Sequence, residues 1–127
     1  MNTSGILLFA HGARDPAWAT PFEAAAARLK ERAGPTRVEL AFLEFMSPTI
    51  VEAGQRLAEQ GCDKVTVVPL FLGAGGHVRK DLPKLLDDLR AQYPQVQWAL
   101  SPAVGETDLL IQALADSAWS LASGSAA

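Results

Sequence analysis

The chain has 127 residues, a formal net charge of −3 at pH 7, and 49% hydrophobic against 20% charged residues. This length fits a single domain, and the composition is that of a globular protein rather than a disordered one. The acidic charge argues against a nucleic-acid-binding protein, because neutralising phosphates requires a basic face.

The first β–α unit is predicted near the N-terminus. Residues 6–10 form a continuous apolar run typical of a buried strand, which ends at His11 and Gly12. Pro16 is placed where a helix begins. The apolar stripe of this helix recurs at helical spacing and consists of Trp18, Phe22, Ala25, Leu29 and Ala33.

The second unit repeats this order. Residues 38–42 form a strand, and Ser47 is expected to cap a helix whose first residue is Pro48. Gly61 ends this helix. The apolar stripe of the helix consists of Ile50, Gly54, Leu57 and Ala58.

The third unit has the clearest strand, residues 65–71, in which β-branched side chains dominate. Pro69 donates no ladder hydrogen bond, which indicates an edge position or the end of the strand. A glycine-rich loop over residues 73–77 follows. The next helix tolerates Pro83 only in its first turn, and its stripe consists of Leu82, Leu85, Leu86 and Leu89.

A fourth strand is predicted over residues 96–100, before a helix with the stripe Leu109, Leu110, Ala113, Leu114 and Ala118. Strand and helix therefore alternate four times, which predicts a mainly parallel four-stranded sheet with helices on both faces. We expect a single-domain, three-layer α/β sandwich over residues 1–122. Residues 123–127 contain no core residues and are expected to form a flexible tail.

The apolar runs are too short for a membrane or secreted protein. No run approaches the ~20 residues that cross a bilayer, and residues 6–10 lack the length and basic flank of a signal peptide. Cys62 is the only cysteine, so no internal disulfide can form, and it is expected to pack as a small apolar residue. These features predict a cytoplasmic protein with no membrane partner.

The candidate site lies where the predicted strands end. Ligands of open parallel sheets bind outside the carboxyl ends of the strands. His11 follows the first strand, Glu44 the second, and His77 lies in the loop after the third. Two imidazoles and a carboxylate can bind a divalent first-row metal, and they are also the groups suited to proton transfer near neutral pH.

Several neighbours of this trio are candidate substrate-binding residues. Arg14, Arg79 and Lys80 flank the histidines, where they can bind carboxylates or remain solvated. Phe45 and Met46 adjoin Glu44, where they form an apolar wall or simply pack. The glycine-rich loop permits close approach of a ligand to its backbone, but no Gly-Lys-Ser/Thr sequence follows it, so it is not a P-loop.

Three segments carry a resemblance to a known family: residues 7–16 (LLFAHGARDP), 41–50 (AFLEFMSPTI) and 68–83 (VPLFLGAGGHVRKDLP). They resemble, in the same order, motifs of the CbiX and SirB sirohydrochlorin chelatases. The resemblance covers residues 5 to about 120, and the length is similar to the short, single-domain form of CbiX.

This resemblance implies a class II tetrapyrrole chelatase that inserts a divalent metal into sirohydrochlorin without ATP or an organic cofactor. It implies that His11 and His77 bind the metal, that His11 accepts protons, and that Glu44 is an active-site acid. It assigns macrocycle contacts to Leu72, Gly73, Ala74, Gly75 and Gly76. Short members resemble half of a two-lobed chelatase, which implies a homodimer with the cleft between its lobes. The CbiX-like length favours Co²⁺ and cobalamin synthesis, with Fe²⁺ and sirohaem, or Ni²⁺, as alternatives.

Other functions remain open from the residues alone. The histidine pair can also belong to a non-catalytic carrier of metal or tetrapyrrole. Histidine phosphatases also place His-Gly after a strand, but they require an arginine where this chain has Ala10. A phospho-acceptor receiver domain needs carboxylates after the first strand, and His11 occupies that place.

Overall fold

The computed structural model describes residues 3–73 and 76–124, except for the side chains of residues 76–79. Strands and helices alternate as expected. In chain order they are β1 (Thr3–Ala10), a 3₁₀ helix η1 (Pro16–Ala19), α1 (Thr20–Arg32), β2 (Arg37–Phe42), α2 (Ile50–Glu59), β3 (Cys62–Pro69), α3 (Gly76–Gln92), β4 (Gln97–Leu100), a second 3₁₀ helix η2 (Val104–Glu106), and α4 (Asp108–Ala122).

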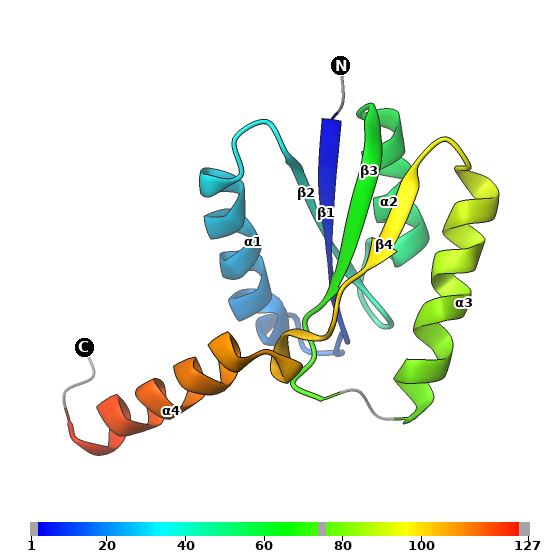
Figure 1. The fold of residues 1–127 in the computed structure, drawn as a ribbon. Coiled ribbons are helices and arrows are strands. Elements are labelled where there is room, and N and C mark those ends of the chain that lie inside the picture. The colour runs from blue at the N-terminus through cyan, green and yellow to red at the C-terminus, as the bar shows by residue number, and fades with distance from the viewer. Residues whose placement is uncertain (1–2, 74–75, 125–127) are drawn as a thin grey trace.

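The four strands form one sheet in the order β2-β1-β3-β4, and every neighbouring pair is parallel. Helix α1 lies on one side of the sheet, whereas α2 and α3 lie on the other (Figure 1). The predicted three-layer α/β architecture is therefore confirmed. Pro69 is the last residue of the inner strand β3, which agrees with its predicted place at a strand end.

The side of the sheet under α2 and α3, here called the closed face, carries the main core. Alternate residues of β1 and β3 point to this side, and Leu7, Phe9, Val65 and Val67 are completely buried there. Burying one large apolar side chain contributes about 1.5–3 kcal/mol. Cys62 joins this core, as expected, and its burial raises the pKa of its thiol. The other fully or nearly fully buried residues of this core include Leu57, Leu86, Leu89 and Trp98.

The opposite side of the sheet has a smaller core. Leu8 and Val38 pack against Ala26 of α1. Ala26 is buried and Ala25 is exposed, so the predicted stripe was wrong at this position by one residue. Helix α1 lies beside β2 and leaves β3 and β4 without a helix on this side (Figure 1). The half-buried residues there, here called the open face, are Thr66, Val68, Leu70 and Ala99.

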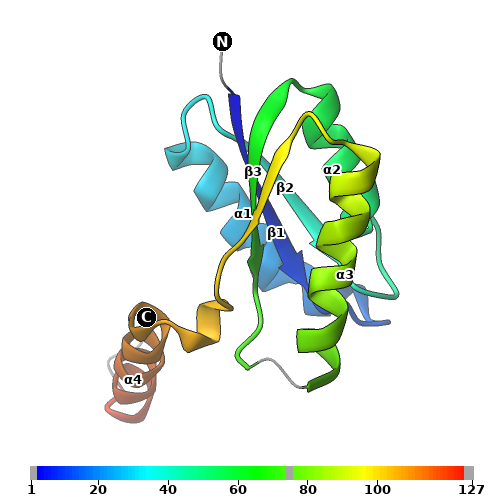
Figure 2. The same cartoon turned by 45° about the vertical axis from the view of Figure 1, so that its right-hand side comes forward.

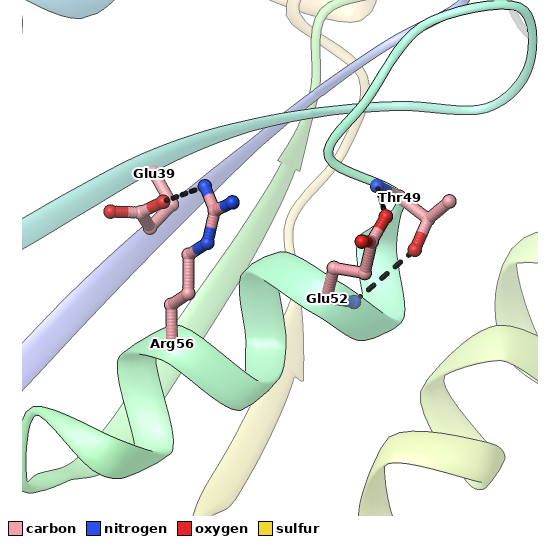
Figure 3. Close-up of polar contacts among 4 residues, drawn as sticks. All are labelled: Glu39, Thr49, Glu52 and Arg56. Atoms are coloured by element: carbon pink, nitrogen blue, oxygen red, sulfur yellow. Dashed lines mark hydrogen bonds and ion pairs between the residues drawn. The ribbon is translucent and has the colours of Figure 1, made fainter.

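Helix α2 begins two residues later than predicted. Its N-cap is Thr49, not Ser47, and the Ser47-Pro48 peptide bond is cis. The Thr49 hydroxyl accepts from the Glu52 N–H at 3.2 Å, and the Glu52 carboxylate accepts from the Thr49 N–H at 2.9 Å (Figure 3). This capping box satisfies two amides at once. It also lowers the pKa of Glu52, chiefly through the Thr49 N–H.

Helix α3 begins earlier than predicted, at Gly76, so Pro83 lies inside the helix rather than in its first turn. A proline at such a position removes one backbone hydrogen bond and crowds the preceding turn. The last two residues of the predicted glycine-rich loop, Gly76 and His77, therefore belong to the helix.

Helix α4 forms where the apolar stripe predicted it, but it projects away from the sheet (Figures 1 and 2). Among the described elements, its one extensive contact is with η2. None of its residues is buried. Its large exposed side chains are Leu109, Ile111, Leu114, Trp119 and Leu121. Within the residues described, no helix combines the length and the hydropathy needed to cross a membrane.

The boundary predicted at residue 122 stays a prediction. Ser123 caps the end of α4, and the rest of the predicted tail from 125 to 127 lies outside the described residues.

Candidate active site

The ends of β1 and β2 bring His11 and Glu44 into contact. His11 Nε2 lies 3.3 Å from Glu44 Oε1, although 33 positions separate the two residues in sequence. Each side chain is 48% exposed, so the pair is open to a ligand from solvent. The predicted meeting of these two residues at one edge of the sheet is what the structure shows.

Backbone hydrogen bonds position this pair. The N–H of Leu43 donates to the carbonyl of Ala10 at 2.9 Å, and that of Glu44 donates to the carbonyl of His11 at 3.1 Å. Gly12 has a φ of 95°, and a Cβ there would lie 1.9 Å from the Glu44 carbonyl oxygen. Only glycine lets the two loops approach this closely, so Gly12 fixes the spacing of His11 and Glu44.

The strand-end aromatic residue Phe71 supports the imidazole. Its ring lies edge-on to that of His11, with 6.2 Å between centroids, and it packs in the same way on Phe9 at 5.9 Å. Phe71 is buried, whereas His11 is exposed. One part of the imidazole ring therefore contacts the buried core, and the rest of the ring faces solvent and Glu44.

Arg14 and Phe45 form the outer wall next to this pair. The Arg14 guanidinium carbon lies 5.0 Å from the centre of the Phe45 ring, within the range of a cation–π contact. Phe45 has a φ of 66°, which is uncommon for a bulky residue, and its side chain is 57% exposed. Met46 instead is half-buried against the cluster that contains Ala10 and Phe42.

A second exposed apolar side chain, Leu72, follows β3 and is 68% exposed. Gly73 is also exposed. Close by, an apolar cavity of about 230 Å³ is lined by Phe71, Leu82 and Leu100, among others. Phe71 thus lines this cavity and also contacts the His11 ring.

The third member of the predicted trio lies at the start of α3. The backbone of His77 is in the first turn of that helix, and its side chain lies outside the described residues, as does that of Arg79. Ala74 and Gly75 lie outside them entirely, whereas Gly76 is the first residue of α3. Lys80 is exposed. Among the side chains that the structure describes, no group of three His, Cys, Asp or Glu is placed to hold a metal.

Two residues of the site were missed from sequence. Phe71 was interpreted as part of a strand, and Gly12 was noted only as the end of one. Their signals were weak: an aromatic residue directly before a glycine-rich loop, and a glycine directly after a histidine.

The fold is an open parallel α/β sheet, and its imidazole–carboxylate pair lies at the carboxyl edge, where sheets of this class bind their ligands. The sequence model of the CbiX family matches residues 5–120. The chain therefore belongs to the CbiX family.

Two curated relatives bear the name sirohydrochlorin cobaltochelatase. The protein of Methanopyrus kandleri is 40% identical over 81 residues, which are 64% of this chain and 57% of that one. The protein of Saccharolobus solfataricus is 42% identical over an alignment of 93 residues, and the match covers 70% of this chain and 71% of that one.

Solved structures agree with the family. A CbiX protein from Marinobacter aquaeolei VT8 superposes with a TM-score of 0.85 at 32% identity, covering 94% of this chain and 98% of that one. The sirohydrochlorin chelatase SirB from Bacillus subtilis subspecies spizizenii, in complex with cobalt, gives 0.79 at 26% identity. That match covers 89% of this chain but 48% of the SirB chain.

Proposed function

We propose that this protein is a sirohydrochlorin cobaltochelatase, a lyase-type metal-inserting enzyme that places Co²⁺ in sirohydrochlorin without ATP, as a step of cobalamin biosynthesis. The contact of His11 with Glu44 at the carboxyl edge of the sheet carries the proposal. The names of the two curated relatives support the substrate and the metal.

The chemistry of insertion fits this pair. Metal insertion replaces two pyrrole N–H protons by the metal ion, so the enzyme needs a proton acceptor beside the macrocycle. Neutral imidazole accepts a proton near neutral pH. The carboxylate of Glu44 stabilises the resulting imidazolium of His11 across their 3.3 Å contact. His11 therefore accepts one of the two protons, once that nitrogen no longer binds the metal, with Glu44 as its partner, and the other proton passes to solvent.

The metal substrate is proposed to be held by His11 and His77 before insertion. His77 follows β3, which is the neighbour of β1, so its backbone belongs to the same edge of the sheet as His11. Imidazole nitrogen is a good ligand for divalent first-row metals. No organic cofactor is needed for this reaction, because the metal is the substrate.

The macrocycle is proposed to lie between the exposed apolar side chains of Phe45 and Leu72, with Arg14 beside it. These side chains suit a flat apolar ring with carboxylate substituents, since Arg14 can bind a carboxylate. Met46 and residues 73–76 complete the proposed substrate contacts.

The protein is proposed to act as a cytoplasmic homodimer. One copy matches 48% of the SirB chain, so two copies supply the length of one such chain. A cleft between two copies can enclose a macrocycle that one exposed edge cannot. The single buried thiol of Cys62 agrees with a reducing compartment.

The assay that tests this proposal follows metal insertion into sirohydrochlorin by absorbance, with Co²⁺ and Fe²⁺ side by side. His11→Ala is expected to lower kcat by about 10²–10⁴-fold, the range for loss of a general base. Glu44→Gln is expected to lower kcat less, because the base remains. The circular dichroism spectra of both variants should match that of the parent.

Glu59→Gln is the matched control, since Glu59 is an exposed carboxylate of α2 outside the site. It should leave the rate unchanged. Parental rates in both site variants would refute the assignment. A parental rate no greater than the spontaneous one would instead indicate a carrier, and faster Fe²⁺ insertion would point to sirohaem synthesis.

A further inference from the structure

The connection between β4 and α4 contacts the connection between β3 and α3, which carries several of the proposed substrate-binding residues. The N–H of Gly105 in η2 donates to the carbonyl of Phe71 at 2.9 Å. A Cβ on Gly105 would lie 1.7 Å from the Leu72 carbonyl oxygen and 2.4 Å from the Leu72 Cα. The backbone of η2 therefore lies directly against the peptide that follows β3, at a separation that only glycine permits.

The sheet and the core hold η2 in this place. The N–H of Ser101 donates to the Val67 carbonyl at 3.0 Å, which continues the pairing of β4 with β3 beyond the end of β4. Ala103 is buried in the core of the closed face. The hydroxyl of Thr107 donates to the Val104 carbonyl at 2.6 Å and closes the turn. The position of η2 is therefore set by contacts outside the active site.

Leu72 is an exposed apolar residue on a firmly held backbone. Its side chain is 68% exposed, whereas Phe71 directly before it is buried. The N–H of Leu70 donates to the Phe9 carbonyl at 2.8 Å, so the chain is attached to β1 just before this point and to η2 at Phe71. Residues in connecting segments are usually more mobile than the strands they follow. Here two neighbouring elements fix the backbone from which the Leu72 side chain projects.

Gly12 and Gly105 make equivalent contacts at two places on the active-site edge. Gly12 lies against the Glu44 carbonyl and brings the connections after β1 and β2 together. Gly105 lies against the Leu72 carbonyl and brings the connections after β4 and β3 together. Gly12 sets the spacing of the pair that takes part in proton transfer. The contact of Gly105 instead supports the part of the edge assigned to the macrocycle.

We propose that Gly105 is a positioning residue for sirohydrochlorin: by supporting the backbone of Leu72, it holds that side chain where the macrocycle binds. The inference rests on the proposed function, in which Leu72 contacts the macrocycle, and adds a residue of the connection after β4 to the site. Gly105 has no side chain with which to bind the substrate, so it acts through Leu72.

The expected consequence of Gly105→Ala is weaker binding rather than slower chemistry. The added methyl group displaces the Leu72 carbonyl, and the leucine side chain moves with it. Losing an apolar contact the size of one methylene weakens recognition by about tenfold or more. His11 and Glu44 are spaced by Gly12 and not by η2, so proton transfer is retained. The variant should therefore raise the Kd and the KM for sirohydrochlorin about tenfold with a much smaller change in kcat.

The first test measures the Kd of sirohydrochlorin without metal, by the change in its fluorescence on titration with protein. Gly54→Ala is the matched control, because a Cβ there would lie 2.6 Å from Leu89 Cδ2 in the core of the closed face. The control should lower the melting temperature and leave the Kd unchanged. An unchanged Kd in Gly105→Ala, or an equal rise in Gly54→Ala, would overturn the proposal.

The second test is a double-variant cycle that asks whether Gly105 acts through Leu72. Leu72→Ala alone should raise the Kd about tenfold, because it removes the side chain that is positioned. In the Leu72→Ala background, Gly105→Ala should add little, since no leucine is left to displace. Two effects that multiply would contradict the proposal, because Gly105 would then affect binding independently of Leu72.

Thr107→Val takes the place of Gly105→Ala if the alanine variant does not fold. It removes the hydroxyl that closes η2 at the Val104 carbonyl. Valine and threonine are similar in size, so no atom is added beside Leu72. The Kd should rise by a smaller factor, and the rise should disappear in the Leu72→Ala background. No rise, or a rise that persists in that background, would count against the positioning role.

The insertion assay separates this inference from the proposed function. A parent that binds sirohydrochlorin with the expected non-additive effects but inserts no cobalt would refute the function and leave the positioning role standing. An active parent whose Gly105→Ala variant binds sirohydrochlorin equally tightly would refute the positioning role alone. A parent that binds no sirohydrochlorin would refute both.

Discussion

The two sides of the sheet differ in how completely one chain covers them. On the closed face, α2 and α3 bury Val65 and Val67 completely. On the open face, Thr66 and Val68 of the same strand are half-buried. Since β3 supplies both pairs, the difference lies in the helices and not in the strand.

This difference shows what β3 is built for. Residues 65–68 form a short β-branched run with apolar side chains on both sides of the sheet, a pattern typical of a strand buried on both faces. One face receives its helices from the same chain. The other face has the sequence of a buried surface without an intramolecular cover, which is the arrangement expected where a second copy completes the layer.

The largest effect on stability is expected on the closed face. Leu57 of α2 is completely buried there, so Leu57→Ala should lower the free energy of unfolding by about 2–5 kcal/mol through lost burial and a residual cavity. Urea unfolding measures this. Leu109→Ala on α4, where the side chain is 83% exposed, should change it by less than about 0.5 kcal/mol. Equal losses would mean that α4 is as well packed as α2 in the single chain.

A smaller and sharper contrast comes from adjacent valines of β3. Val67→Ala removes two methyl groups from a completely buried site and should cost about 2 kcal/mol. Val68→Ala should cost less than about 1 kcal/mol in dilute solution, because its side chain is half-buried.

Protein concentration extends this contrast. If the homodimer of the proposed function covers the open face, the cost of Val68→Ala should rise with protein concentration while that of Val67→Ala stays constant. Urea unfolding at two protein concentrations measures both. Equal costs for the two valines in dilute solution would contradict the distinction between the faces.

Most of the fold was predictable because hydrophobic spacing specifies which side of each element is buried. The same spacing does not specify what covers that side. The stripe containing Leu110 and Leu114 predicted α4 correctly, but no local pattern distinguishes packing on the chain's own sheet from exposure to solvent. Helix α4 follows η2, where a Cβ on Gly105 would lie 1.7 Å from the Leu72 carbonyl oxygen, and no periodicity encodes such a close approach.

The start of α2 was wrongly predicted because the sequence offers two competing signals. Ser47-Pro48 is a good helix start, and so is Thr49 followed by Glu52 three residues later. The capping box satisfies two amides where a serine cap satisfies one, and the helix follows it.

The site was predictable in part. Parallel topology alone brings residues after β1 and β2 to one edge, which led to His11 and Glu44. Phe71 and Gly12 were missed because their roles depend on distances between loops that no periodicity encodes. His77 stays a prediction, since its side chain lies outside the described residues.

Effects smaller than those of Leu57→Ala and Val67→Ala are expected at the cap of α2, one of the two helices on the closed face. Thr49→Ala should cost about 1 kcal/mol, because it removes the hydroxyl that accepts from the Glu52 N–H. The Glu52 half of the box should depend on pH. Its pKa lies below the usual value of 4.5 when folded, so its stabilising contribution is present above that value and is lost as the pH falls through the folded pKa.

Glu52→Gln removes this titration. The melting temperature of the parent should therefore exceed that of the variant at neutral pH, and the gap should narrow once the pH falls below 4.5. Glu59→Gln, on the same helix but outside the cap, should show a smaller gap with little such narrowing. A gap for Glu52→Gln that is independent of pH would mean that the carboxylate charge adds nothing to the cap. The cap would then depend on the Thr49 hydroxyl, which accepts from the N–H of residue 52.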